Sequence, residues 1–199
     1  MQDDFLDAPD PDLFGRLLAV TNRHLAARPF LEQLRRVARL GPRAVILREK
    51  DLPEPSYKEL ARQAMALCAA EGVRCILHTF VGTAKELDSK AVHLPLALLE
   101  KSANELRAFE VIGASVHSKE EALRAEQLGA TYLSAGHVFA TECKPGLAPR
   151  GLEFLREVAG AVKIPVYGIG GVKLDKGQLE ELLKAGAAGG CVMSSFMRV

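Results

Sequence analysis

The chain has 199 residues, of which 48% are hydrophobic and 26% are charged, and its formal net charge is +1. This length and balance suit one globular domain that buries its own core. The near-neutral charge and the absence of tryptophan argue against a nucleic-acid partner, and no apolar run reaches the length of a membrane span. The acidic N-terminus lacks the basic and apolar regions of a signal peptide, so we expect a cytoplasmic protein without membrane contact.

The four cysteines, Cys68, Cys75, Cys143 and Cys191, form no CxxC pair. Their spacing indicates neither a zinc site nor a disulfide framework. Reduced thiols in a cytosolic protein are the simpler interpretation.

Short apolar runs alternate with helical stretches along the chain. We expect strands over residues 17–21, 44–49, 74–78, 91–95, 111–116, 132–139, 165–169 and 190–194. Helices are expected over about 30–40 and 56–71, and only a weak helical segment separates the third and fourth strands. After the fifth strand, Ser118 and Glu121 have the spacing of a capping box, which predicts the start of a helix.

This alternation predicts the α/β class, with a parallel sheet and crossover helices. Eight strands that are apolar on both faces favour a single (β/α)8 TIM barrel over residues 1–199, with short helices and a truncated C-terminal helix. Residues 1–14 are expected to be a loose N-terminal tail. An open doubly wound sheet is the alternative, but no GxGxxG motif opens the first helix, as a dinucleotide-binding sheet would need.

Two cations lie at the end of the second strand, where barrels place their catalytic residues. Strand alternation puts Ile46, Arg48 and Lys50 on one face. If that face points inward, both cations converge on an anionic substrate. The alternative is an ordinary solvated strand end.

The loops after the seventh and eighth strands read GIGG (residues 168–171) and MSS (residues 193–195). Barrels often bind phosphate between these two loops, where glycine lets backbone N–H groups approach the oxygens. We therefore predict a phosphate site, and a plain tight turn is the other explanation for the glycines.

Histidines accompany two further strand ends. His117 shares a face with Ser115, although His117 could instead bond only to nearby backbone. His137 falls late in the sixth strand, where it is expected to share a face with Ala135, and it is near Lys144 and the phosphate loops. A neutral histidine can both take and give a proton near pH 7, whereas a structural role is the alternative. His93 is expected to pack within the fourth strand.

In this order and at this spacing, the motifs resemble the thiamine phosphate synthase/TenI superfamily over nearly the whole chain. ILREK at residues 46–50 is similar to the superfamily's QLREK, and SVHS at 115–118 and GIGG at 168–171 match its later motifs. The resemblance implies a phosphate site formed by Gly170, Gly171, Ser194 and Ser195.

Departures from the synthase pattern bear on the activity. Synthases of this superfamily carry an Asn-Asp pair after the third strand and another Asp after the fourth, and these handle magnesium and pyrophosphate. Here the third strand ends in LHTF, which includes His78, the fourth continues without a carboxylate, and Ile46 replaces the Gln. Magnesium usually takes one or two carboxylates, so we expect no metal site.

The segment at residues 136–151, GHVFATECKPGLAPRG, resembles the TenI branch, the thiazole tautomerases. This resemblance implies an isomerase that aromatises thiazole phosphate carboxylate by proton transfer, with His137 as its catalytic residue and no cofactor. The substrate-binding residues expected around it are Arg48, Lys50, His78, Ser115, His117, Thr141 and Lys144.

Two alternatives remain open. One is a thiamine phosphate synthase that joins hydroxymethylpyrimidine pyrophosphate to thiazole phosphate with magnesium. The other is a non-catalytic protein that binds a phosphorylated ligand, because a barrel does not imply activity. The expected partner is a small phosphorylated thiazole, with no nucleic acid and no membrane, and we expect a homo-oligomer, either a dimer or a tetramer.

Overall fold

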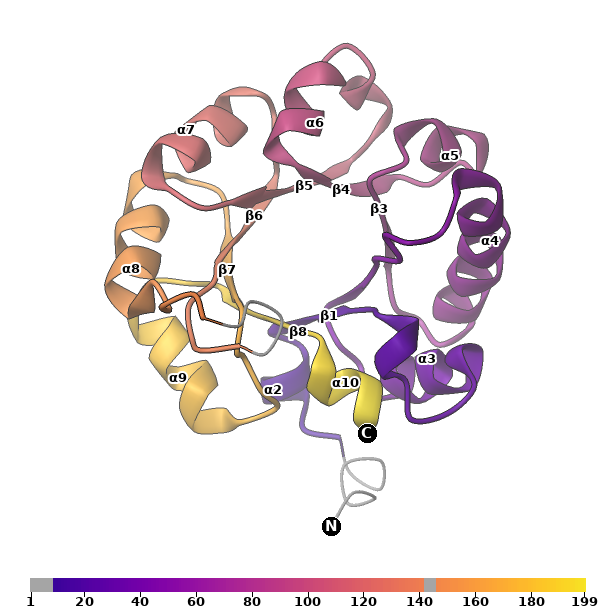
Figure 1. Cartoon of the computed structure of the whole chain (residues 1–199), viewed down its shortest axis with the longest axis horizontal. Coiled ribbons are helices and arrows are strands. Elements are labelled where there is room, and N and C mark those ends of the chain that lie inside the picture. The colour runs from indigo at the N-terminus through magenta and orange to yellow at the C-terminus, as the bar shows by residue number, and fades with distance from the viewer. Residues whose placement is uncertain (1–8, 142–145) are drawn as a thin grey trace.

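Eight parallel strands close into a barrel in chain order, so that β1 pairs with both β2 and β8 (Figure 1). The computed structural model describes residues 9–141 and 146–199. The strands are β1 (Leu17–Val20), β2 (Ala44–Leu47), β3 (Cys75–His78), β4 (Ala91–Pro95), β5 (Val111–Val116), β6 (Tyr132–Gly136), β7 (Val166–Ile169) and β8 (Gly189–Val192). The predicted α/β class and (β/α)8 barrel are confirmed.

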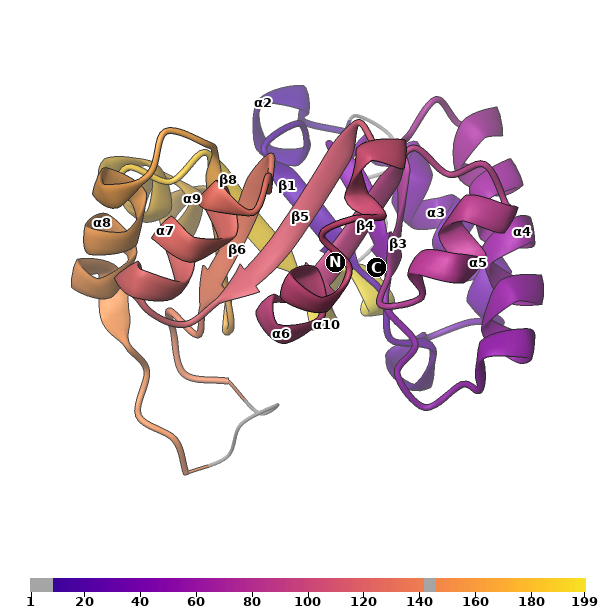
Figure 2. The same ribbon diagram turned by 90° about the horizontal axis from the view of Figure 1, so that it is seen from above.

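The helices surround the barrel, and the last one, α10, has only five residues (Figures 1 and 2). They are α2 (Pro11–Phe14), α3 (Phe30–Arg39), α4 (Glu54–Ala70), α5 (Val81–Glu86), α6 (Leu96–Lys101), α7 (Lys119–Gln127), α8 (Gly151–Ala161), α9 (Lys176–Lys184) and α10 (Ser194–Arg198), with 3₁₀ turns η1 (Arg23–Leu25) and η2 (Leu106–Ala108). None of the helices in the described ranges is long and apolar enough to cross a membrane.

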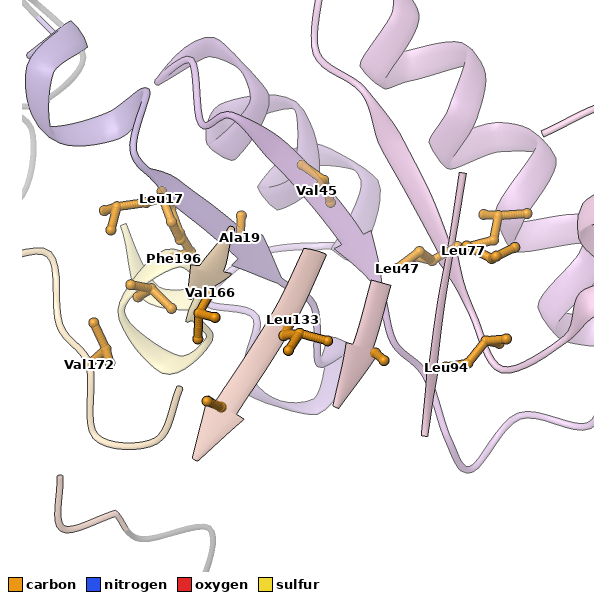
Figure 3. Packing of buried hydrophobic residues seen from close by; sticks show 14 of the residues in the cluster. Leu17, Ala19, Val45, Leu47, Leu77, Leu94, Leu133, Val166, Val172 and Phe196 are labelled. Carbon is orange, nitrogen blue, oxygen red and sulfur yellow. The ribbon is translucent and has the colours of Figure 1, made fainter. Parts of the chain in front are cut away.

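Alternation along the strands divides the core into two layers. Side chains such as Leu17, Val45 and Leu133 belong to the layer between the strands and the helices (Figure 3). Their neighbours on the other face, such as Leu18 and Tyr132, belong to a separate cluster in the barrel lumen. Because both faces of the strands are largely buried, most strand residues are apolar, as is usual for a parallel barrel.

The expected loose tail over residues 1–14 is too long. Pro11–Phe14 forms the short helix α2, and the Asp10 side chain caps it by accepting backbone hydrogen bonds at its first turn. Leu13 and Phe14 are buried, and the Phe14 ring lies 6.1 Å from that of Phe196 in α10. Apolar burial therefore holds this segment against the barrel, whereas residues 1–8 lie outside the described part of the chain.

The sixth strand ends at Gly136 rather than at residue 139. Beyond it the backbone follows the glycine turn after β7, with Phe139 N–H donating to the Gly170 carbonyl at 2.9 Å. Strand alternation therefore stops before His137, and the expectation that His137 shares a face with Ala135 is wrong. Ala135 lies in the outer layer, whereas His137 reaches the mouth of the barrel.

Candidate functional site

A pocket of about 470 Å³ opens at the carboxyl ends of the strands. Every barrel strand except β3 and β4 is followed by a loop residue that lines it, and those two strands contribute their last residues, His78 and Pro95. This is the end of the barrel from which the β6–α8 connection extends, opposite α2 (Figure 2). The pocket therefore lies where parallel barrels assemble their active sites.

Two cations reach this pocket from the end of β2. Arg48 and Lys50 both line it, two and four residues after Ile46, whose side chain is in the lumen. The inward face predicted from strand alternation is therefore the one that the structure has. Together they make this wall of the pocket positively charged.

The residue between them, Glu49, has a different task. Its carboxylate is buried and accepts hydrogen bonds from the Thr21 hydroxyl at 2.6 Å and from the Arg23 backbone N–H at 3.0 Å. These bonds tie the end of β2 to the loop after β1. That loop places Asn22 in the pocket lining, a contribution that the sequence analysis missed.

Two buried histidines, His78 and His93, lie near the Arg48 charge. The rings of His78 and His93 stack with their centroids 5.6 Å apart. Burial, together with repulsion from neighbouring groups including Arg48, lowers the pKa of His78 to about 2 and that of His93 to about 3. Both rings are therefore neutral at pH 7. His78 lines the pocket as expected, and His93 packs within β4 as expected.

His93 joins the lumen to the pocket through hydrogen bonds. Its Nδ1 lies 2.8 Å from the Tyr132 hydroxyl, and its Nε2 lies 2.9 Å from the Ser115 hydroxyl and 3.3 Å from that of Ser134. Ser115 and Ser134 both line the pocket. Ser134 is a second site residue that sequence reasoning missed, although a polar residue inside an otherwise apolar strand was an available signal.

His117 lines the pocket, and its partner is a side chain rather than the nearby backbone considered as the alternative. Its backbone N–H donates to the Glu121 carboxylate at 2.6 Å. The Glu121 backbone N–H in turn donates to the Ser118 hydroxyl at 3.1 Å, so Ser118 caps α7 as predicted, whereas the Glu121 carboxylate accepts from His117 and not from the Ser118 N–H of a full capping box. His117 is therefore held at the pocket edge by the start of this helix.

His137 is 4% exposed and lines the pocket next to the glycine turn. Its Nδ1 is buried without a hydrogen-bond partner among the described residues, and its Nε2 lies 3.4 Å from the Leu147 carbonyl oxygen. A buried, unsatisfied ring nitrogen is costly in a folded protein.

The turn after β7 requires its glycines and also lines the pocket. Gly170 and Gly171 have φ values of 95° and 71°, and a Cβ on Gly170 would lie 2.3 Å from the His137 Cβ. The tight turn is therefore real. Phosphate binding by this turn stays a prediction, for which the pocket lining by Gly170, Gly171 and Ser194 gives a suitable position.

Three other residues were predicted to bind substrate or phosphate: Thr141, Ser195 and Lys144. Thr141 lines the pocket. Ser195, next to Ser194 at the start of α10, is not among the lining residues. Lys144 lies outside the described residues.

The pocket is short of metal ligands. Over residues 9–141 and 146–199, no group of three or more His, Cys, Asp or Glu side chains could hold a metal ion. The lining residues in these ranges include no carboxylate, because Glu49 is committed to Thr21 and Arg23. Magnesium prefers carboxylate oxygens, so the described side chains do not fit a magnesium site.

The fold and the site together define a (β/α)8-barrel protein with a pocket at the carboxyl ends of its strands, which Arg48 and Lys50 line. The chain belongs to the thiamine monophosphate synthase (TMP-TENI) family, whose model matches residues 17–196. This membership puts it among the enzymes of thiamine biosynthesis.

Several relatives of this chain are named thiamine-phosphate synthases. A thiamine-phosphate synthase of Pyrococcus furiosus is 36% identical over 183 residues, which make up 92% of this chain and 86% of that protein. One from Roseiflexus castenholzii is 34% identical over 95% of this chain and 84% of its own length. The solved thiamine phosphate pyrophosphorylase of Pyrococcus furiosus superposes with a TM-score of 0.76 at 33% identity, covering 93% of this chain and 89% of that one.

These comparisons correct the predicted activity. The isomerase assignment, which rested on the segment around His137, is wrong, because relatives at 34% and 36% identity are named as synthases, which are transferases. The segment after β6 resembles the tautomerase branch only locally, whereas the similarity to synthases extends over more than nine-tenths of the chain.

Proposed function

We propose that this chain is a thiamine phosphate synthase, which joins hydroxymethylpyrimidine pyrophosphate to thiazole phosphate and releases pyrophosphate. The observation that carries the proposal is the pocket at the barrel mouth, which Arg48 and Lys50 line together with the glycine turn. Membership of the synthase family supplies the reaction class.

The main requirement of this reaction is that the site stabilise negative charge. A carbon–nitrogen bond forms between the two rings, and the bond to the pyrophosphate oxygen breaks, so negative charge grows on the leaving group. Arg48 and Lys50 can stabilise that charge, because cations in a partly enclosed site interact more strongly with anions than they do in water. His78 also lines the pocket but is neutral, so it adds no positive charge there.

The second substrate needs a place for its phosphate. Gly170, Gly171 and Ser194 line the pocket in the loops after β7 and β8, where barrels often bind phosphate. A thiazole phosphate held there shares the cavity with the side chains of Arg48 and Lys50, which line it from the end of β2. We assign no step to magnesium, because the described side chains do not form a site for it. The expected homo-oligomer also stays a prediction.

A coupling assay tests the proposal. The purified chain is incubated with both substrates, and thiamine phosphate and pyrophosphate are measured with added magnesium and with a chelator. We expect equimolar formation of the two products, and a loss of about 10²-fold in kcat/KM for Arg48→Gln. Arg62→Gln removes the same charge from the exposed face of α4 and serves as the control.

Binding is measured on the same preparations. If the folded protein binds thiazole phosphate but forms neither product under any magnesium condition, the synthase proposal is refuted. That result would favour the non-catalytic ligand-binding alternative, for which the lack of carboxylates in the described lining is the supporting observation.

A further inference from the structure

A second cavity, of about 430 Å³, opens at the amino-terminal end of the barrel. Inward side chains of a strand repeat every two residues, so a lumen open at both ends has an upper and a lower layer. On four strands, two residues that are two positions apart line the two cavities: Leu18 and Val20, Ile76 and His78, Tyr132 and Ser134, and Tyr167 and Ile169. The second cavity is therefore the amino-terminal layer of the same lumen. We call it the lower cavity and the pocket at the carboxyl ends the upper pocket; in Figure 2 the amino-terminal end, on the side of α2, is drawn at the top.

Two arginines stand at the entrance to this cavity. Arg43 directly precedes β2 and Arg74 directly precedes β3, and both are exposed residues that line it. No aspartate or glutamate within the described ranges lines the cavity with them. Neighbouring strands thus present two positive charges to one opening without a carboxylate beside them.

The cavity floor is amphipathic. Leu18 and Ile76 provide apolar surface, and the rings of Tyr132 and Tyr167 meet edge to face with centroids 5.9 Å apart. Burial raises the pKa of Tyr167, and the nearby Arg43 offsets this only in part, so its hydroxyl is protonated and can donate a hydrogen bond. An anionic ligand with a small apolar body would therefore find partners for both of its parts.

The number of cations favours one class of anion. A single carboxylate is matched by one arginine, whereas a phosphate group carries nearly two negative charges and three acceptor oxygens. We propose that the cavity at the amino-terminal end of the barrel is a second anion-binding site, which takes a small phosphate-bearing molecule through Arg43 and Arg74. This site is separate from the one proposed for the substrates.

The three tyrosines of the chain make the site observable. Tyr132 and Tyr167 line the lower cavity, whereas Tyr57 bonds to the Leu47 carbonyl and lines neither cavity. We would label the tyrosine rings with carbon-13, assign the signals with Tyr57→Phe and Tyr132→Phe variants, and titrate inorganic phosphate at constant ionic strength. We expect the Tyr167 signal to shift to saturation while that of Tyr57 stays in place.

Charge-matched variants identify the binding residues. Arg43→Gln with Arg74→Gln should weaken the apparent affinity read from Tyr167 by at least about 10-fold, because both phosphate partners are lost. Arg62→Gln, on the outside of α4, should leave it unchanged. The single Arg74→Gln variant repeats the test with one exposed side chain altered, in case the double variant is less stable.

Two outcomes would overturn the proposal. One is a Tyr167 signal that does not respond to phosphate. The other is a response that persists undiminished in the Arg43→Gln, Arg74→Gln protein, since phosphate would then be acting from the upper pocket.

Discussion

At the scale of single residues, burial decides what the lumen histidines can do. His78 and His93 lie deep enough for their pKa values to fall to about 2 and about 3. An unfolded chain has histidine pKa values near 6.5. The folded protein therefore keeps two rings neutral at a pH where the unfolded chain would protonate them.

This difference predicts a loss of stability in acid. Below about pH 6.5 the unfolded chain binds more protons than the folded one, so the free energy of unfolding falls as the pH is lowered toward the folded pKa values. Each buried histidine costs up to about 1.4 kcal/mol per pH unit in that window. Urea unfolding of the wild type at pH 7 and pH 5 should show this fall.

Variants separate the histidines from the rest of the chain. His93→Gln should reduce the difference between the two pH values by roughly half, since one of the two buried rings is gone. Arg62→Gln, on the exposed face of α4, keeps every histidine and should leave the difference nearly unchanged. An equal pH dependence in all three proteins would contradict the assignment to buried rings.

At the scale of elements, hydrophobic patterning predicts much of the barrel but not where each strand stops. The bounds of β4 and β5 agree with those expected from the sequence, because their apolar runs end at a proline and at a capped helix. β2 ends two residues early, since Arg48 N–H donates to the Thr21 side chain instead of a neighbouring strand. No local pattern shows a contact made 27 residues away.

The same limit applies to the site. Arg48, Lys50 and the glycine turn can be found from their places after strands, because the carboxyl ends of all strands meet at one mouth. Asn22 cannot, because its position depends on the bonds that Glu49 makes to the loop after β1. The activity was predicted wrongly, because the segment around His137 resembles the tautomerases whereas the chain as a whole is similar to synthases.

The cap of α7 gives a prediction for a single element. Ser118→Ala removes the acceptor of the Glu121 N–H and should lower the free energy of unfolding by about 1 kcal/mol, measured in urea. Ser118→Asn keeps an oxygen able to accept the same bond and should restore most of the loss. Equal destabilisation by both variants would show that the side chain acts through packing rather than capping.

At the scale of the whole molecule, closure of the barrel leaves little room where large rings cross the lumen. Gly113 of β5 faces this crowding, since an added Cβ would lie 2.3 Å from the Tyr132 ring and 2.4 Å from His93 Nδ1. The rings of His93 in β4 and Tyr132 in β6 thus fit in the lumen only because Gly113, on the strand between them, has no side chain. The packing there is a property of the closed barrel and of no single strand.

Gly113→Ala should therefore lower the free energy of unfolding by about 1–3 kcal/mol, as is typical of overpacked cores. Gly160→Ala is the matched change on α8, where an added Cβ meets nothing within 4 Å, and it should raise stability by up to about 1 kcal/mol. Chemical unfolding of both proteins measures whether the free energy of unfolding falls in one and rises in the other. A Gly113→Ala protein that is more stable than the wild type would contradict the lumen packing.

The bonds of His93 give the lumen a direction. A neutral imidazole has one donor and one acceptor nitrogen. If Nδ1 donates to Tyr132 at the lower cavity, Nε2 must accept from Ser115 at the upper one, and if Nε2 donates, Nδ1 must accept. The position of a single proton on the His93 ring thus decides which of the Tyr132 and Ser115 hydroxyls donates to the ring and which accepts from it. A ligand that binds at one end of the barrel and changes the role of one hydroxyl therefore changes the role of the other hydroxyl at the opposite end.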